Sequence, residues 1–391
     1  MTSLTNTPRS ERLHIGIFGK RNAGKSSLLN AITGQDIAVV SPTKGTTTDP
    51  VFKAMELLPL GPIVLIDTPG IDDVGELGAL RIEKTKDMLR KTDIALLVVD
   101  PTEGLTADEH TLIRLFKQSD VRYLTVYNTS TPPNHSQTDE IWVNALTGEN
   151  VSVLKETLAQ LGKAEAQTHP LVADLLSPGD VVILVTPIDE SAPKGRLILP
   201  QQQVIRDVLE AGCIPILSQT DSLSEALGKL RHRPKLVITD SQAFKQVAAL
   251  VPQDIGLTSF SILMARYKGV LNQAVQGAKA IDTLQDGDPI LIAEACTHHR
   301  QCEDIATVKL PRWIEAHTGA KPTYTFSSGG DFPRDLTPYK LIIHCGGCMV
   351  NMREMHYRSR TAQEVSIPMT NFGVAISHMQ GILARCIAPL S

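Results

Sequence analysis

The feature that most limits the fold of this chain is an apolar segment followed by a glycine-rich loop and a helical run. Residues 13–18 are predicted to form a strand, residues 27–32 have helical spacing, and Gly19-Lys-Arg-Asn-Ala-Gly-Lys-Ser26 between them matches G-x-x-x-x-G-K-S. In this order, loop amides and Lys25 cradle phosphates, and the Ser26 hydroxyl can bind Mg²⁺. The pattern predicts an N-terminal P-loop domain of the α/β class.

Two further loops fit the same chemistry. Asp67-Thr-Pro-Gly70 follows the apolar segment 63–66, so Asp67 is predicted to hold Mg²⁺ through water and the Gly70 amide to meet the γ-phosphate. Between the two motifs lies the polar loop 44–49, which suits a switch that closes over the metal. Three loops in this order and spacing predict hydrolysis of a nucleoside triphosphate.

The pattern G-x-x-N-x-G-K-S-S with G-T-T and D-T-P-G resembles the translation-factor-like GTPases of the TrmE and Era type. The resemblance implies a Mg²⁺-dependent, K⁺-stimulated GTPase, with Thr47 as the switch ligand of Mg²⁺ and Asn22 binding the K⁺ ion. No Gln follows the 67–70 motif, so slow intrinsic hydrolysis is expected. The predicted catalytic residues are Lys25, Thr47, Asp67 and Gly70, and the nucleotide-binding residues are Gly19, Asn22, Ala23, Gly24, Lys25, Ser26, Ser27, Asp67, Asn128 and Ala145.

The residues expected to recognise the guanine base differ from those of the TrmE and Era group. The group carries N-K-x-D after the next strand, and this chain has Asn128-Thr-Ser-Thr131. The carboxylate that accepts hydrogen bonds from guanine is therefore missing. Residues 144–148 resemble the S-A-x-x-G loop, which places Ala145 at the guanine oxygen. We predict a preference for GTP over ATP with reduced discrimination.

A second strand-to-loop pattern carries cysteines. Residues 341–343 are continuously apolar, as in a strand buried on both faces, and Cys345-Gly-Gly-Cys348 follows. Cys348 is predicted to open a helix reaching Tyr357, where the helix N-terminus would lower the thiol pKa. Upstream, the apolar segment 289–295 delivers Cys296 in the same way. If the two strands lie parallel in one sheet, three thiols meet at its carboxyl edge and form an iron–sulfur site.

Cys296-x-His298 followed by His344-Cys345-x-x-Cys348 resembles the FeFe-hydrogenase maturation GTPases of the HydF family, along the whole chain. The resemblance implies a GTPase domain at 8–163, a dimerisation domain at 172–258 and a cluster domain at 268–391. It implies a 4Fe-4S cluster on the three cysteines with one iron open. It also implies a scaffold that receives a diiron precursor from radical-SAM maturases, delivers it to apo-hydrogenase, and forms a homodimer or a larger assembly.

Several alternatives remain at the cluster. His298 and His344 can be ligands, hydrogen-bond donors to cluster sulfurs, or residues that simply end their strands. Cys302 and Glu303 lie close enough in sequence to Cys296 to reach the fourth iron. Three Cys and one His also make a structural zinc site, so zinc is the main alternative to iron.

Composition narrows the function further. The net charge of −4 and the pI of about 6.3 disfavour a nucleic-acid-binding surface spread over the protein, though not a local patch, and the 4% aromatic content disfavours stacking platforms for single strands. No apolar run approaches the roughly 20 residues that span a bilayer, and residues 1–10 lack a signal-peptide core, so a cytoplasmic protein without membrane contact is expected. Six cysteines in such a chain favour metal ligation over disulfides.

The middle of the chain alternates strands and helices without a convergent catalytic set, which predicts a second parallel sheet with an assembly role. The three-domain interpretation competes with two others. One is an RNA-modification or ribosome-assembly GTPase with a structural metal. The other is a non-enzymatic assembly module whose nucleotide pocket has decayed.

Overall fold

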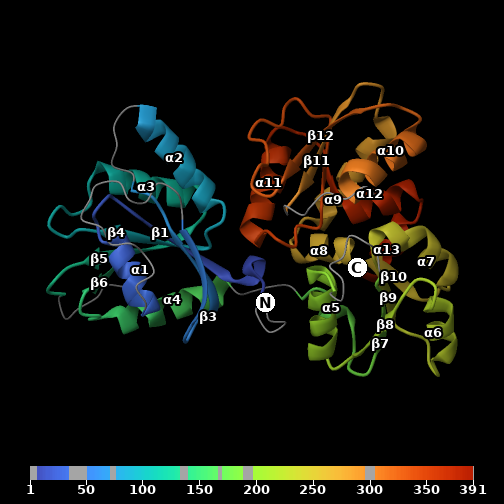
Figure 1. The fold of residues 1–391 in the computed structure, drawn as a ribbon, viewed down its shortest axis with the longest axis horizontal. Coiled ribbons are helices and arrows are strands. Elements are labelled where there is room, and N and C mark those ends of the chain that lie inside the picture. The colour runs from blue at the N-terminus through green and yellow to red at the C-terminus, as the bar shows by residue number, and fades with distance from the viewer. Residues whose placement is uncertain are drawn as a thin grey trace. The chain divides into compact units, whose positions relative to one another are not determined.

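The computed structural model describes residues 7–34, 51–70, 76–132, 140–165, 170–187, 197–295 and 304–390. The chain divides into two compact units, Met1–Thr168 and His169–Ser391. Among the described residues the first unit holds one sheet and the second holds two (Figure 1). All three sheets are mainly parallel and flanked by helices, so the predicted α/β class is confirmed.

The sheet of the first unit has the strand order β2-β3-β1-β4-β5-β6. Among its described strands, only β2 runs antiparallel to its neighbour. The central strand β4 is apolar throughout and buried along its whole length, as expected for a parallel strand covered on both faces. The strands are β1 (Leu13–Gly19), β2 (Val51–Leu57), β3 (Gly61–Asp67), β4 (Ile94–Val99), β5 (Arg122–Asn128) and β6 (Glu140–Val143).

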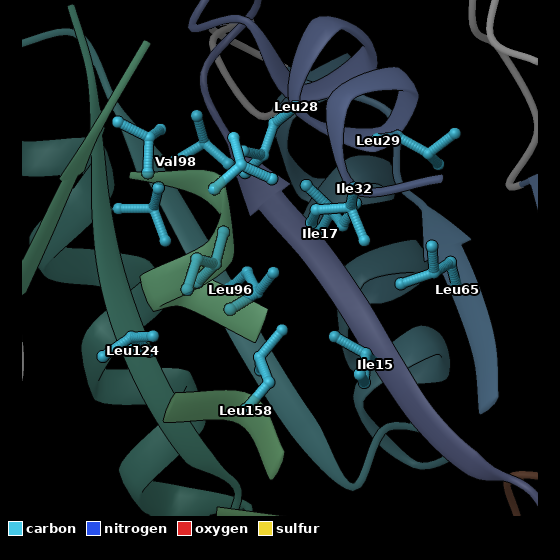
Figure 2. Packing of buried hydrophobic residues seen from close by; sticks show 14 of the residues in the cluster. Ile15, Ile17, Leu28, Leu29, Ile32, Leu65, Leu96, Val98, Leu124 and Leu158 are labelled. Atoms are coloured by element: carbon cyan, nitrogen blue, oxygen red, sulfur yellow. The ribbon is translucent and has the colours of Figure 1, made fainter. Parts of the chain in front are cut away.

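In the described part of this unit, four helices cover the sheet in two layers. On one face, α1 (Lys25–Thr33) and α4 (Val151–Glu165) pack Leu28, Ile32 and Leu158 against alternate strand residues, as Figure 2 shows. On the other face, α2 (Glu76–Leu89) and α3 (Ala107–Gln118) pack against Phe18 and the remaining alternate residues of the strands. This three-layer core fixes the carboxyl ends of β1 and β3, from which the phosphate loops emerge.

The first sheet of the second unit has the order β10-β9-β7-β8, and all pairs are parallel. Helices α5 and α8 pack on one face, and α6 and α7 on the other. The elements are β7 (Val181–Val185), β8 (Ile214–Ser218), β9 (Leu236–Thr239), β10 (Gly256–Ser259), α5 (Leu199–Glu210), α6 (Leu223–Lys229), α7 (Phe244–Leu250) and α8 (Phe260–Tyr267).

The second sheet of this unit has the order β12-β11-β13-β14, again all parallel. Helices α10 and α12 cover one face and α11 covers the other. The elements are β11 (Pro289–Glu294), β12 (Thr323–Ser328), β13 (Leu341–His344), β14 (Met369–Asn371), α9 (Leu271–Ala278), α10 (Leu310–Thr318), α11 (Met352–Glu364), α12 (Phe372–Met379) and α13 (Leu383–Ile387).

Helix α8 joins the cores of the two sheets. Phe260 and Leu263 pack into the first sheet's core, whereas Ile262 and Ala265 pack into the two cores of the second. The division of this unit into a dimerisation domain and a cluster domain therefore stays a prediction. No helix in the described ranges has the length and apolar character needed to cross a bilayer.

Two local predictions are wrong. Residues 258–259 belong to strand β10, not to the start of a helix, because their buried positions pair in register with β9. The helix predicted to open at Cys348 begins four residues later, since the Asn351 side chain accepts the Glu354 amide and caps α11 there. Cys348 thus lies in the preceding turn.

Candidate functional site

The glycine-rich loop turns from β1 into α1 through residues in the left-handed region, with φ of 62° at Asn22 and 88° at Gly24. The Lys25 side chain is buried and reaches back across the loop. Its Nζ donates to the Gly19 carbonyl at 3.1 Å and to the Lys20 carbonyl at 2.6 Å. This conformation holds an ammonium group at the mouth of the loop, where a phosphate is expected.

Asp67 ends β3, directly beside β1 in the parallel sheet. The Ser26 hydroxyl donates to its Oδ2 at 3.1 Å. Burial raises the pKa of the Asp67 carboxyl, against the lowering effects of Lys25 and Ser26. Its Oδ1 is buried and has no hydrogen-bond partner among the described residues. A hydroxyl and a carboxylate with an unsatisfied oxygen fit a magnesium ion, which prefers oxygen ligands. Thr47 lies outside the described residues.

The 67–70 motif also lies close to the glycine-rich loop. A Cβ at Gly70 would lie 2.7 Å from the backbone nitrogen of Arg21 and 2.9 Å from its Cα. Backbone cannot give way as a flexible side chain can, so only glycine fits at this point. The structure therefore brings together the residues predicted from the glycine-rich loop 19–26 and from the 67–70 motif.

Asn128 links the phosphate loop to the predicted base-reading loop. Its Oδ1 accepts the Ala145 amide at 3.1 Å, and its amide nitrogen lies where a Cβ on Gly24 would collide with it. Asn144 shapes the same loop by accepting the amides of Leu146 and Thr147. Asn128 thus connects the glycine-rich phosphate loop with the 144–148 loop. Residues 129–131 are Thr-Ser-Thr and contain no carboxylate that could replace the missing one.

The predicted thiol site lies at the carboxyl edge of the second sheet of the second unit. Strands β11 and β13 are adjacent and parallel, with Ala293 paired to His344. The Cys345 amide donates to the Ala293 carbonyl at 2.8 Å, and its Sγ accepts amides of Ala295 at 3.1 Å and Gly347 at 3.4 Å. The chain just before Cys296 therefore lies against the Cys345 sulfur. Cys296, His298, Cys302 and Glu303 themselves lie outside the described residues.

The expected lowering of the Cys348 pKa is not found. Burial raises the pKa of the Cys348 thiol to about 12, and burial likewise raises the pKa of Cys345. The reason is positional: no helix begins at Cys348, and its side chain packs against the core of the neighbouring sheet instead. Lys268 opposes this effect by favouring the thiolate of Cys348.

His344 is completely buried at the end of β13. Its Nδ1 pairs with the Cys345 carbonyl at 2.8 Å, and its Nε2 lies 3.0 Å from Nη1 of Arg358. Because the guanidinium can only donate, Nε2 accepts and the proton resides on Nδ1. Burial and the nearby Arg358 lower the His344 pKa to about 3. Both ring nitrogens thus have partners within the protein.

Arg358 is a functional candidate that the sequence analysis missed. It is 1% exposed and donates to Glu354 Oε1 at 2.9 Å and to the Gly329 carbonyl at 2.8 Å, besides His344. Its guanidinium also lies 4.9 Å from the centre of the Phe332 ring. The Glu354–Arg358 spacing was visible in the sequence, but such pairs are usually solvent-exposed, so nothing marked this one as buried.

Comparison with known proteins gives three family matches. Residues 14–129 match the model of the 50S ribosome-binding GTPase, 171–269 the hydrogen maturase F dimerization domain, and 272–389 the hydrogen maturase F tetramerization domain. The two maturase models follow each other in order along more than half of the chain. They support self-association of the chain, and the first match supports GTP hydrolysis.

Curated relatives are tRNA modification GTPases. The chain is 38% identical over 154 residues to MnmE of Thiobacillus denitrificans, covering 38% of this chain and 34% of that protein. It is 30% identical over 243 residues to MnmE of Streptococcus mutans, covering 59% and 50%. The chain thus spans between a third and a half of these relatives. A crystal structure of a variant of Aquifex aeolicus Era bound to GDP.AlF4- matches at 21% identity and a TM-score of 0.36, over 53% of this chain and 91% of Era.

Proposed function

Since this chain belongs to the hydrogen maturase F family of hydrogenase maturation GTPases, we propose that it is a GTP-hydrolysing scaffold that binds a 4Fe-4S cluster and carries a diiron precursor. The precursor is its cargo, received from radical-SAM maturases and delivered to apo-hydrogenase in the cytoplasm. The observation that carries the proposal is the Cys345 sulfur at the carboxyl edge of β13, hydrogen bonded to the amide of the residue preceding Cys296.

The residues present fit an iron–sulfur cluster. Cys345 and Cys348 offer two sulfur donors in one turn, and Cys296 would be the third. Amides that donate to sulfur, as Ala295 and Gly347 do to Cys345, stabilise thiolates and tune cluster potentials. When bound, the cluster would supply an iron open to an exchangeable ligand. His344 orients Cys345 through its carbonyl and leaves the fourth position to the segment after Cys296.

The nucleotide site supplies the hydrolytic activity. Lys25 would neutralise the β- and γ-phosphates, and Ser26 and Asp67 would hold Mg²⁺, which neutralises charge that develops on the phosphates. The Gly70 amide and the loop amides position the γ-phosphate. We assign Asn22 to a K⁺ ion and Thr47 to the switch, as the GTPase resemblance implies.

The competing RNA-modification interpretation finds a parallel in the MnmE relatives. However, residues 171–389 match maturase models almost without a break, and the chain is acidic overall. An acidic chain offers little of the electrostatic attraction on which RNA binding depends. We therefore favour the maturase function.

Replacing Cys345 with Ser is expected to abolish the bound cluster. Anaerobically reconstituted wild type should hold close to four Fe per chain and give a 4Fe-4S EPR signal on reduction, because three thiolates grip the cluster. Cys345→Ser should lose most of both. The matched control is Cys386→Ser, a buried cysteine of helix α13 outside the Cys345–Cys348 turn in sequence, which should keep its iron. Zinc in place of iron in the wild type, or full iron in Cys345→Ser, would refute the cluster assignment.

Guanine selectivity is expected to be weak for a GTPase. The carboxylate that accepts from guanine N1 and N2 is missing, and hydrogen bonds to charged groups contribute about 1.5–3 kcal/mol. Competition binding should therefore place ITP within a few-fold of GTP. Thr131→Asp, which introduces a carboxylate at the position of the missing one, should improve GTP over ITP. Strong discrimination against ITP by the wild type would contradict the prediction.

A further inference from the structure

A cluster of metal-binding side chains lies apart from the thiol turn. Asp282 in η4 (Lys279–Thr283), His317 in the last turn of α10 and His378 in the last turn of α12 converge. Their donor atoms all lie within 4.8 Å of one another. The Nε2 atoms of His317 and His378 lie 2.8 Å and 2.9 Å from different oxygens of the Asp282 carboxylate.

This cluster belongs to the opposite edge of the sheet from Cys345. Asp282 precedes β11 and His317 precedes β12, so both lie near the amino ends of these strands. His378 closes the helix that runs back from the carboxyl end of β14. The three residues therefore form a separate site, independent of the proposed cluster function.

The backbone holds the three donors in place. Ile281, Ile314 and Ile376 are buried in one shared core and lie next to or within one turn of the donors. Each donor thus projects from an anchored segment. Two helix C-termini also meet here, and their partial negative charge favours a cation.

We propose that Asp282, His317 and His378 bind a divalent transition-metal ion of the zinc class. Two imidazole nitrogens and one carboxylate oxygen are a common protein ligand set for Zn²⁺ at 2.0–2.2 Å, with the fourth position left to water. The metal would take the place of the two Nε2 protons that now face the carboxylate, and Nδ1 would carry the proton on each ring.

The exposure of the cluster agrees with an open coordination position. The side chains of His317, Asp282 and His378 are 30%, 50% and 20% exposed. A fourth ligand from solvent can therefore reach the ion. A site with three protein ligands and one exchangeable position binds and releases small ligands, as closed four-ligand sites do not.

The test is the number of Zn²⁺ ions bound per chain, measured by equilibrium dialysis and metal analysis. Because thiols also bind zinc, the decisive quantity is the difference between variants. Wild type should bind one more equivalent than His378→Ala and than Asp282→Asn, and Zn²⁺ should raise the melting temperature of the wild type by more than theirs. His232→Ala, an exposed histidine elsewhere in the unit, should match the wild type.

Asp282→Asn keeps the size of the side chain, so it tests the proposal even if His378→Ala fails to fold. Equal zinc stoichiometry and equal thermal response in the wild type and a folded Asp282→Asn would overturn the site. The three residues would then be a hydrogen-bonded clamp between helix ends.

Discussion

Replacing Lys25 with Ala is expected to lower the rate of GTP hydrolysis on the order of 10²–10³-fold, the usual loss when one preorganised charge donor is removed. In the structure the Lys25 ammonium is held at the loop by the Gly19 and Lys20 carbonyls, ready to turn onto a phosphate. The iron content should not change, because the thiol turn belongs to the other compact unit. Phosphate release with K⁺ present, and iron analysis of the same preparation, measure both quantities.

Lys117→Ala is the matched control. It removes one exposed lysine from α3 in the same unit, so it changes the charge equally but leaves the loop intact. Hydrolysis should remain within about twofold of the wild type, as surface substitutions rarely matter. Undiminished hydrolysis in Lys25→Ala would contradict the role of the phosphate loop in the mechanism. Loss of iron in that variant would show that the two sites are not separable.

The nucleotide loops could be predicted from the sequence because their chemistry is local. Strand, loop and helix are contiguous there, and Gly24 and Lys25 have roles fixed by neighbours a few residues away. The parallel pairing of β11 and β13 was predictable for a related reason. Continuous apolar runs followed by turns indicate buried parallel strands, and such strands share their carboxyl edge.

The sequence-based predictions fail where tertiary contacts, rather than local sequence patterns, determine the structure. Strand β10 ends in Thr258-Ser259, polar residues that are buried by tertiary contacts such as the pairing with β9 and the hydrogen bond between Ser241 and Ser259. The start of α11 was misplaced because Asn351, not the Gly-Gly turn, caps it. Arg358 and the Asp282–His317–His378 cluster join residues far apart in the chain, and no spacing rule links such positions.

Replacing Arg358 with Ala is expected to lower the free energy of unfolding of the second unit by about 3–5 kcal/mol, the usual loss when one partner of a buried ion pair is removed. The side chains of Arg358 and Glu354 are 1% and 7% exposed, and Oε2 of Glu354 already lacks a hydrogen-bond partner within the described ranges. Without Arg358, a buried carboxylate would remain unpaired, and His344 would lose the donor that fixes its ring. Urea unfolding followed by Trp313 fluorescence, in a Trp142→Phe background, reports on this unit alone.

The same helix provides the control. Arg360 and Glu364 form an ion pair of the same spacing and the same 2.9 Å length, but they are 72% and 58% exposed. Exposed pairs of this kind contribute only about 0.2–0.5 kcal/mol, so Arg360→Ala should barely shift the transition. Adding Glu354→Leu to Arg358→Ala should recover part of the lost stability, because an apolar side chain then replaces the unpaired charge. Equal effects of Arg358→Ala and Arg360→Ala would mean that burial does not set the energy of this pair.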